Sequence, residues 1–169
     1  TPDGEWIFAF GLDPMLTADV VTGRVFAGGL LGPCSEMLIS DDDGETWTEP
    51  KPLNPAWTGD RHVAQYKADG RLVVTFRDMQ KDSPTRGDWI VQVGAWQDLV
   101  DAGPGAYRAR LMDNHHGWDC GYPGLERLPD GSFMATSYGH WVEGEAPFVV
   151  SLRFTLAELD ALLPADPKD

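Results

Sequence analysis

The residues best suited to chemistry gather in one stretch, which reads DNHHGWD over residues 113–119. Its last residue, Asp119, is a candidate general acid, because a positioned carboxyl group can give a proton to a leaving oxygen. The indole of Trp118 is suited to stacking on a sugar ring. The alternative is structural: Asp119 would then belong to a turn, and Trp118 would pack against the rest of the protein. The stretch therefore points to carbohydrate chemistry without requiring it.

The same stretch does not favour a metal ion. His115 and His116 are adjacent, so their side chains point in different directions on an extended chain. The acidic run at residues 41–43 lacks the spacing of a calcium-binding loop. The sequence therefore predicts no metal site and no cofactor. Two further histidines, His62 and His140, are candidates for lining a binding site, and a hydrogen-bonded loop residue is the alternative for each.

The elements that must position these residues are predicted from a repeated turn. Asp-Gly occurs at residues 3–4, 69–70 and 130–131, each time before an apolar run, which is a strong hairpin signal. The spacing of about 60 to 66 residues suits a repeated unit of four strands. We expect strands over residues 5–10, 34–39, 48–53, 62–67, 71–77, 89–96, 107–112, 122–128, 133–138 and 148–154. Residues 12–33 are expected to form a glycine-rich excursion with one extra strand over 24–27.

One helix is predicted at the end of the chain, over about residues 156–163. Thr155 is the expected N-cap, Glu158 completes a capping box, and Pro164 ends the helix. The fold class is therefore all-β, with one short C-terminal helix.

Composition narrows the partners. The chain has 169 residues and a formal net charge of −14, so nucleic acid and anionic membranes are poor partners. It has no apolar run of about 18 residues, so the sequence predicts no membrane span. The two cysteines, Cys34 and Cys120, do not make a disulfide framework, and two buried free thiols are favoured over a disulfide.

The sequence SDDDGETW at residues 40–47 predicts a turn held by local hydrogen bonds. The carboxylate of Asp42 can accept hydrogen bonds from nearby backbone amides, Gly44 can adopt a positive φ, and Ser40 can cap the turn. Trp47 is expected to place its indole on the core. The pattern Ser-x-Asp-x-Gly-x-Thr-Trp resembles the Asp-box, the turn that joins the third and fourth strands of a blade in sialidase-like β-propellers.

The resemblance extends to the stretch CGYPGLERLPDG at residues 120–131, which is similar to a sialidase segment that contains the nucleophilic tyrosine. It implies that Tyr122 is the nucleophile and that Arg77 and Arg86 bind the carboxylate of an acidic sugar. A phenol needs a neighbouring base to act in this way. Where the family has its activating glutamate, this chain has Arg61, which is counted as a further candidate for substrate binding. Asp60 or Glu126 is then left to replace the glutamate.

The resemblance is to the C-terminal half of a sialidase-superfamily propeller and covers the whole chain as one unit. It implies blades over about residues 1–55, 60–113 and 120–155. Three blades cannot close a ring, so a second copy or a missing N-terminal half is expected to complete it. The resemblance also implies a secreted or periplasmic location. The expected function is that of a glycoside hydrolase-like protein that recognises an acidic sugar. The alternative is a non-catalytic carbohydrate-binding or structural module that pairs with another chain.

Overall fold

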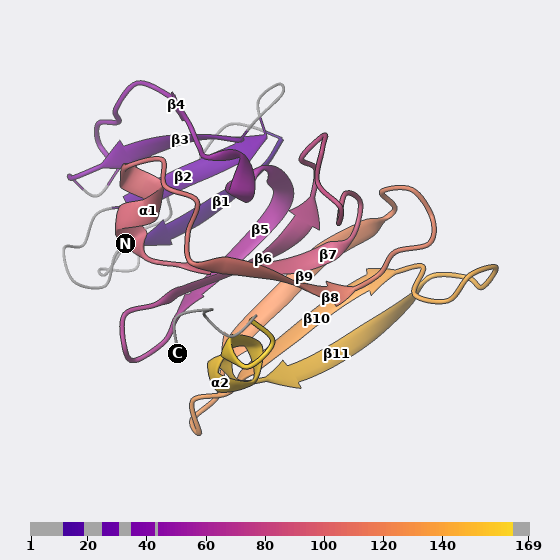
Figure 1. Ribbon diagram of the computed structural model, residues 1–169. Coiled ribbons are helices and arrows are strands. Elements are labelled where there is room, and N and C mark those ends of the chain that lie inside the picture. The colour runs from indigo at the N-terminus through magenta and orange to yellow at the C-terminus, as the bar shows by residue number, and fades with distance from the viewer. Residues whose placement is uncertain (1–11, 19–24, 31–34, 43, 164–169) are drawn as a thin grey trace.

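The computed structural model describes residues 12–18, 25–30, 35–42 and 44–163, and side chains are described from residue 35 onwards. These residues form three antiparallel sheets, with strand orders β1-β2-β3-β4, β5-β6-β7-β8 and β11-β10-β9 (Figure 1). The strands are β1 (Leu12–Ala18), β2 (Val25–Leu30), β3 (Ser35–Ser40), β4 (Lys51–Pro52), β5 (Gly59–Tyr66), β6 (Leu72–Asp78), β7 (Trp89–Gly94), β8 (Tyr107–Met112), β9 (Cys120–Arg127), β10 (Phe133–Gly139) and β11 (Phe148–Phe154). The all-β class is confirmed.

The strand predictions hold for the second and third sheets and fail in part for the first. All seven strands from β5 to β11 lie where the Asp-Gly turns and apolar runs place them, within about three residues at each end. The glycine-rich excursion over 12–33 is wrong, because β1 and β2 pair there as antiparallel strands. The extra strand expected over 24–27 is confirmed in part, since β2 begins at Val25 and extends to Leu30. The expected strand over 48–53 shrinks to the two residues of β4. The predicted strand over 5–10 and Cys34 lie outside the described residues.

The middle sheet is buried on both faces, and this arrangement makes the core. Every residue of β6 and β7 is buried. Because side chains alternate along a strand, Leu72, Val74 and Phe76 pack toward β3 with Met37 and Ile39. The side chains on the other face of β6 and β7 pack toward the third sheet, and they are Val73, Trp89, Val91 and Val93. The middle sheet is therefore packed between the first and the third sheet.

The strand that comes first along the chain in each sheet (β1, β5 or β9) lies beside the corresponding strand of the next sheet. β1 contacts β5, and β5 contacts β9. Each has an irregular register near its start. The breaks in pairing fall between Leu12 and Met15 in β1, between Asp60 and Val63 in β5, and opposite Ser137 in β9. Such β-bulges redirect side chains at the ends of sheets. Here they fall at the same end of adjacent strands.

The acidic turn after β3 has the predicted hydrogen bonds. The Asp42 carboxylate accepts a hydrogen bond from the Thr46 amide at 2.9 Å, the Ser40 hydroxyl accepts one from the Gly44 amide at 2.8 Å, and Gly44 has φ 89°. The expectation for Trp47 is wrong: its indole is only half-buried, because its Nε1 donates to the Gly44 carbonyl at 3.0 Å and closes the turn.

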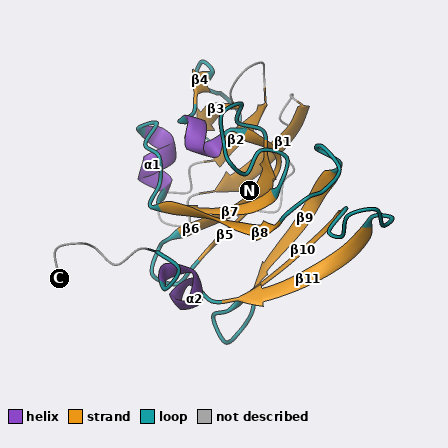
Figure 2. Cartoon of the chain, turned by 45° about the vertical axis from the view of Figure 1, so that its right-hand side comes forward, coloured by secondary structure: helices purple, strands orange, loops and turns teal. Residues whose placement is uncertain are grey.

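Two short α-helices lie at the ends of strands (Figure 2). Helix α2 (Leu156–Asp160) has the predicted capping box between Thr155 and Glu158 but ends three residues before the expected 163. Helix α1 (Trp96–Val100) was not predicted, and it occupies the end of the expected strand 89–96. Neither helix is long or apolar enough to cross a membrane.

Asp160 ties α2 to the middle sheet. Its carboxylate accepts hydrogen bonds from the Arg71 guanidinium at 2.9 and 3.0 Å and from the Tyr107 hydroxyl. The hydrogen bond from Tyr107 is the largest of the effects that lower the pKa of Asp160 below its ordinary value. This cluster therefore fastens the end of the third sheet to β6 and β8.

Replacing Asp160 with alanine should lower the free energy of unfolding by about 1–2 kcal/mol, because both donors lose a charged acceptor at a partly exposed site. The melting temperature, followed by circular dichroism, should fall by several degrees. The matched control is Asp82→Ala at an exposed turn position. Equal melting temperatures for the two variants would contradict the role of this cluster.

Candidate functional site

Arg77 connects the second sheet to the third. It lies near the end of β6, is 8% exposed, and donates through Nε to Asp60 Oδ1 at 2.8 Å and through Nη2 to Asp60 Oδ2. Its remaining amino group, Nη1, donates to the backbone carbonyls of Trp118 and Cys120. Burial opposes the charge of Arg77, but the hydrogen bonds and charge of Asp60 outweigh burial, so the pKa of Arg77 is raised. The guanidinium thus holds the segment that leads into β9.

The bulges of β5 and β9 bring Arg61 and Tyr122 into contact. Both residues have positive φ, 59° and 52°, which is uncommon for residues other than glycine. The Arg61 guanidinium carbon lies 3.5 Å from the centre of the Tyr122 ring. Gly121 makes this approach possible, since a Cβ there would lie 2.6 Å from Cδ of Arg61. The Tyr122 side chain is nevertheless 65% exposed.

Tyr138 links Tyr122 to the carboxylate of Asp119. The Tyr138 ring stacks beside the Tyr122 ring with centroids 6.1 Å apart, and its hydroxyl donates to Asp119 Oδ1 at 2.8 Å. Asp119 Oδ2 lies 3.0 Å from His140 Nε2. Hydrogen bonds from His140 and Tyr138 lower the pKa of Asp119. An ionised Asp119 is suited to act as a base, an electrostatic partner or a metal ligand rather than as a proton donor.

Trp118 and Arg86 lie on the neighbouring loops. Trp118 is 60% exposed, and the guanidinium carbon of Arg86 is 5.9 Å from its ring centre. The loops themselves are in close contact, because a Cβ on Gly87 would lie 2.5 Å from the Gly117 carbonyl oxygen. Two exposed aromatic rings, each with an arginine beside it, therefore flank the start of β9.

Glu126 lies elsewhere. It is near the end of β9, four residues beyond Tyr122, which is roughly 13 Å along a strand. There it borders a separate hollow of about 520 Å³. The lining residues of this hollow are Gln65, Tyr66, Lys67, Ala68, Gly70, Glu126 and Arg127. The structure thus brings Asp119, Tyr122 and Arg61 together and leaves Glu126 apart from them.

His62 is buried beneath the site. Its Nε2 lies 3.0 Å from the Trp57 carbonyl oxygen, and its ring stacks on Phe76 with centroids 4.4 Å apart. Because a carbonyl oxygen only accepts, Nε2 carries the proton of the neutral ring, and Nδ1 is buried with no hydrogen-bond partner among the described residues. Burial lowers the pKa of His62 from 6.5 to about 4. His62 is therefore neutral and acts as packing for the β5 bulge.

Sequence reasoning named His140 only as a candidate for lining a binding site, and it missed Tyr138. Both come from the end of β10, and neither has a local signal that would link it to Asp119, some 20 residues earlier. Their contact with Asp119 arises from the antiparallel pairing of β9 and β10, which brings Gly139 opposite Cys120. Cys120 itself is a free, buried thiol whose pKa is raised to about 12 by burial, so it is not a nucleophile.

Solved structures show the same fold. The chain is similar to a protein of unknown function from Dyadobacter fermentans, with a TM-score of 0.65, 18% identity, and coverage of 83% of this chain and 36% of that one. An endo-arabinase from Bacteroides thetaiotaomicron matches with a TM-score of 0.51 and 17% identity, over 83% of this chain and 55% of the other. A xylan β-1,4-xylosidase from Bacillus halodurans matches with a TM-score of 0.51 and 15% identity, over 83% and 27%.

The chain therefore spans about a third, a half and a quarter of these three proteins. No protein-family model and no curated protein matches the sequence. At these identities the likeness establishes a shared fold with two glycoside hydrolases and no more.

The neutral state of His62 predicts a pH-dependent stability. The unfolded chain binds a proton on this residue below about pH 6.5, whereas the folded chain binds it only near pH 4. Between these values the unfolded state holds more protons, so stability rises with pH. Lowering the pH from 7 to 4 should cost about 3 kcal/mol of unfolding free energy from this residue.

Urea unfolding at several pH values measures this slope. The variant His62→Gln keeps a donor for the Trp57 carbonyl but does not titrate, so its slope should be smaller than that of the unchanged chain. The control His115→Gln changes an exposed histidine and should retain the slope. An unchanged slope in His62→Gln would show that the account of His62 is wrong.

Proposed function

We propose that this chain forms a carbohydrate-binding site of a glycoside hydrolase-like β-propeller, at the start of β5 and β9 where the two bulges meet. The observation that supports it most is the contact between Arg61 and Tyr122. Two residues with unfavourable backbone conformations stack on one another and leave an aromatic ring exposed. Outliers of this kind cost about 1–3 kcal/mol each and cluster at binding and catalytic sites.

The chemistry of the site suits a sugar. An exposed ring offers a flat apolar surface for the C–H face of a pyranose or furanose, and Arg61 behind it fixes its orientation. Asp119 provides a carboxylate that accepts hydrogen bonds from sugar hydroxyls. In this proposal Tyr122 and Trp118 are ring contacts, Asp119 is the polar contact, and Arg77 with Asp60 positions the loop rather than touching the ligand.

The propeller interpretation rests on the stacking of the sheets and on the adjacent first strands. In this interpretation three blades surround an axis that is lined by β1, β5 and β9. The blades cover about residues 1–55, 60–113 and 120–155, and the helix at about 156–163 follows them. The likeness to parts of longer proteins supports a ring completed by further chain or by a second copy. Hydrolysis would need the rest of that ring, because the proposed catalytic Glu126 lies at the far end of β9.

A carboxylated sugar, as in the sialidase interpretation, is the second candidate ligand. It is favoured by Arg61 and Arg86, the two arginines that lie beside exposed aromatic rings. Arg77 is less suited to this task, since Asp60 already neutralises its charge. The exposed Asp119 opposes an anionic ligand, so the neutral sugar is the first candidate.

Isothermal titration with xylo-oligosaccharides, arabino-oligosaccharides and sialyllactose tests the proposal and separates the two candidates. Replacing Tyr122 with alanine should weaken binding by at least about tenfold, because the ring is the central apolar contact. The control Phe148→Ala removes another exposed ring, on β11, and should bind normally. Binding that is unaffected by Tyr122→Ala, or no binding of any of the three probes, would overturn the proposal.

A further inference from the structure

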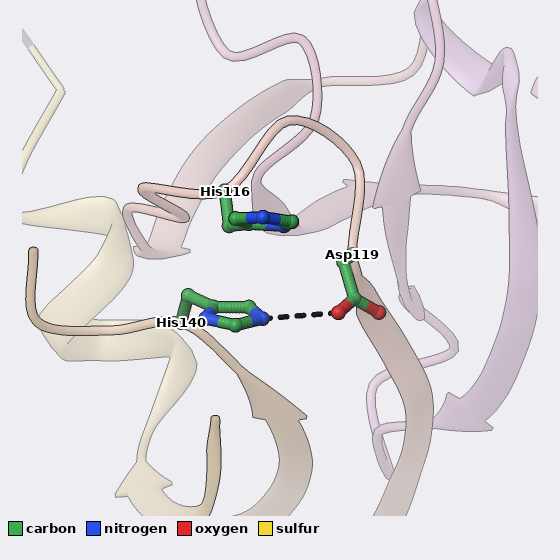
Figure 3. Close-up of side chains that lie close together, drawn as sticks. All are labelled: His116, Asp119 and His140. Carbon is green, nitrogen blue, oxygen red and sulfur yellow. Dashed lines mark hydrogen bonds and ion pairs between the residues drawn. The ribbon is translucent and has the colours of Figure 1, made fainter. Parts of the chain in front are cut away.

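Three potential metal ligands from two separate segments lie close together (Figure 3). His116 and Asp119 lie on the loop before β9, and His140 follows β10 directly. One ligand atom from each lies within 4.8 Å of the others. The imidazole rings of His116 and His140 are stacked with centroids 4.4 Å apart, and His140 Nε2 faces the Asp119 carboxylate. All three side chains remain in contact with solvent.

Both ring nitrogens of His140 are directed at oxygen atoms. Nδ1 faces the Glu145 carbonyl oxygen at 3.3 Å. Nε2 lies 3.0 Å from Oδ2 of Asp119. A ring nitrogen and a carboxylate oxygen at this separation can bind the same metal ion.

The environment of His140 is also the one in which metal-binding histidines are found. Such a histidine typically donates its other ring N–H to a backbone carbonyl or carboxylate, which fixes the ring and exposes the ligating nitrogen. The Glu145 carbonyl has this position here. Tyr138 does the same for Asp119, because its hydroxyl donates to Oδ1 and leaves Oδ2 directed at His140.

The loop is held in place before any ion binds. The Asn114 side chain is buried, donates to the carbonyls of Gly87 and Gly117 and accepts from the His140 amide. The His115 amide donates to the His140 carbonyl at 2.9 Å. These bonds fasten the loop that contains His116 and Asp119 to the residue that provides the third ligand, so little ordering is needed on binding.

We propose that His116, Asp119 and His140 bind a divalent transition-metal ion of the zinc class. Two imidazoles and one carboxylate suit zinc, whereas calcium and magnesium bind oxygen ligands. Tetrahedral zinc with bonds of about 2.0–2.1 Å places its ligand atoms about 3.3 Å apart. The exposed His116 side chain can close the remaining gap by turning about its own torsions. The fourth position is open to solvent, as in zinc sites that bind a water or a ligand rather than in closed structural sites.

This inference goes beyond the carbohydrate site and does not depend on it. The open position would lie near Tyr122, since Asp119 contacts Tyr138 and Tyr138 stacks beside Tyr122. A zinc ion there would also neutralise the only carboxylate assigned to sugar contact. The two proposals are therefore tested with different probes, zinc chloride in one case and oligosaccharides in the other.

Isothermal titration of the chelator-treated chain with zinc chloride measures the site directly. We expect one zinc ion per chain, with a dissociation constant in the micromolar range or below. Replacing His116 with alanine should weaken binding by more than about 100-fold, because it removes one of the three ligands, whereas the loss of an outer contact typically costs about 10- to 100-fold. The matched control is His115→Ala: it removes the neighbouring exposed imidazole and keeps the backbone bond to His140.

Two further measurements make the result decisive. Tyr138→Phe should weaken zinc binding by about 10- to 100-fold, because the hydroxyl orients the Asp119 carboxylate. Saturating zinc should raise the melting temperature of the unchanged chain and of His115→Ala but not that of His116→Ala. The proposal is overturned if the unchanged chain takes up no zinc at 100-fold excess. Equal zinc binding by His116→Ala and His115→Ala would also overturn it.

Discussion

The buried pair of Arg77 and Asp60 is the constraint on which the site depends. Two charges out of water are costly unless their hydrogen bonds are nearly complete, and here four donated bonds satisfy the guanidinium. Two of these bonds cross from β6 to the segment before β9. The pair therefore fixes the spacing of the second and third sheets at one end, and it does so where the backbone of β5 and β9 departs from regular pairing.

The rest of the site follows from that fixed spacing. The middle sheet is packed on both faces and provides a rigid frame. The bulge in β5 of this sheet and the bulge in β9 of the third sheet bring Arg61 and Tyr122 into contact. The ordered loop over residues 114–119 then sets Asp119 between Tyr138 and His140. A rigid scaffold that holds a few exposed, strained side chains is the usual arrangement of a binding site on a β-rich fold.

Much of the fold could be predicted from local signals, and little of the site could. Asp-Gly turns and apolar runs located β5 to β11, and Thr155 with Glu158 located α2, because each of these signals lies within a few residues. β1 was missed and β2 was expected only over 24–27, since glycines in 25–30 weaken the strand pattern and pairing with a neighbour is needed to make it a strand. The sequence indicated Asp119, Tyr122 and Trp118 as candidate site residues, because their side chains are suited to acid–base chemistry or to stacking. Their partners were not predicted, because Arg77–Asp60, Arg61–Tyr122 and Asp119–His140 are contacts across strands or sheets that depend on register.

A titration of the isotopically labelled chain with xylo- and arabino-oligosaccharides, followed by amide NMR shifts, tests the central claim most directly. The account predicts that the shifts concentrate at residues 60–62, 118–122 and 138–140, where the two bulges and the Asp119 loop meet. It also predicts that the amides around Gln65 and Glu126, at the opposite end of the same strands, stay unchanged. Shifts confined to that opposite end would contradict the account, because the sugar would then bind away from Arg61 and Tyr122.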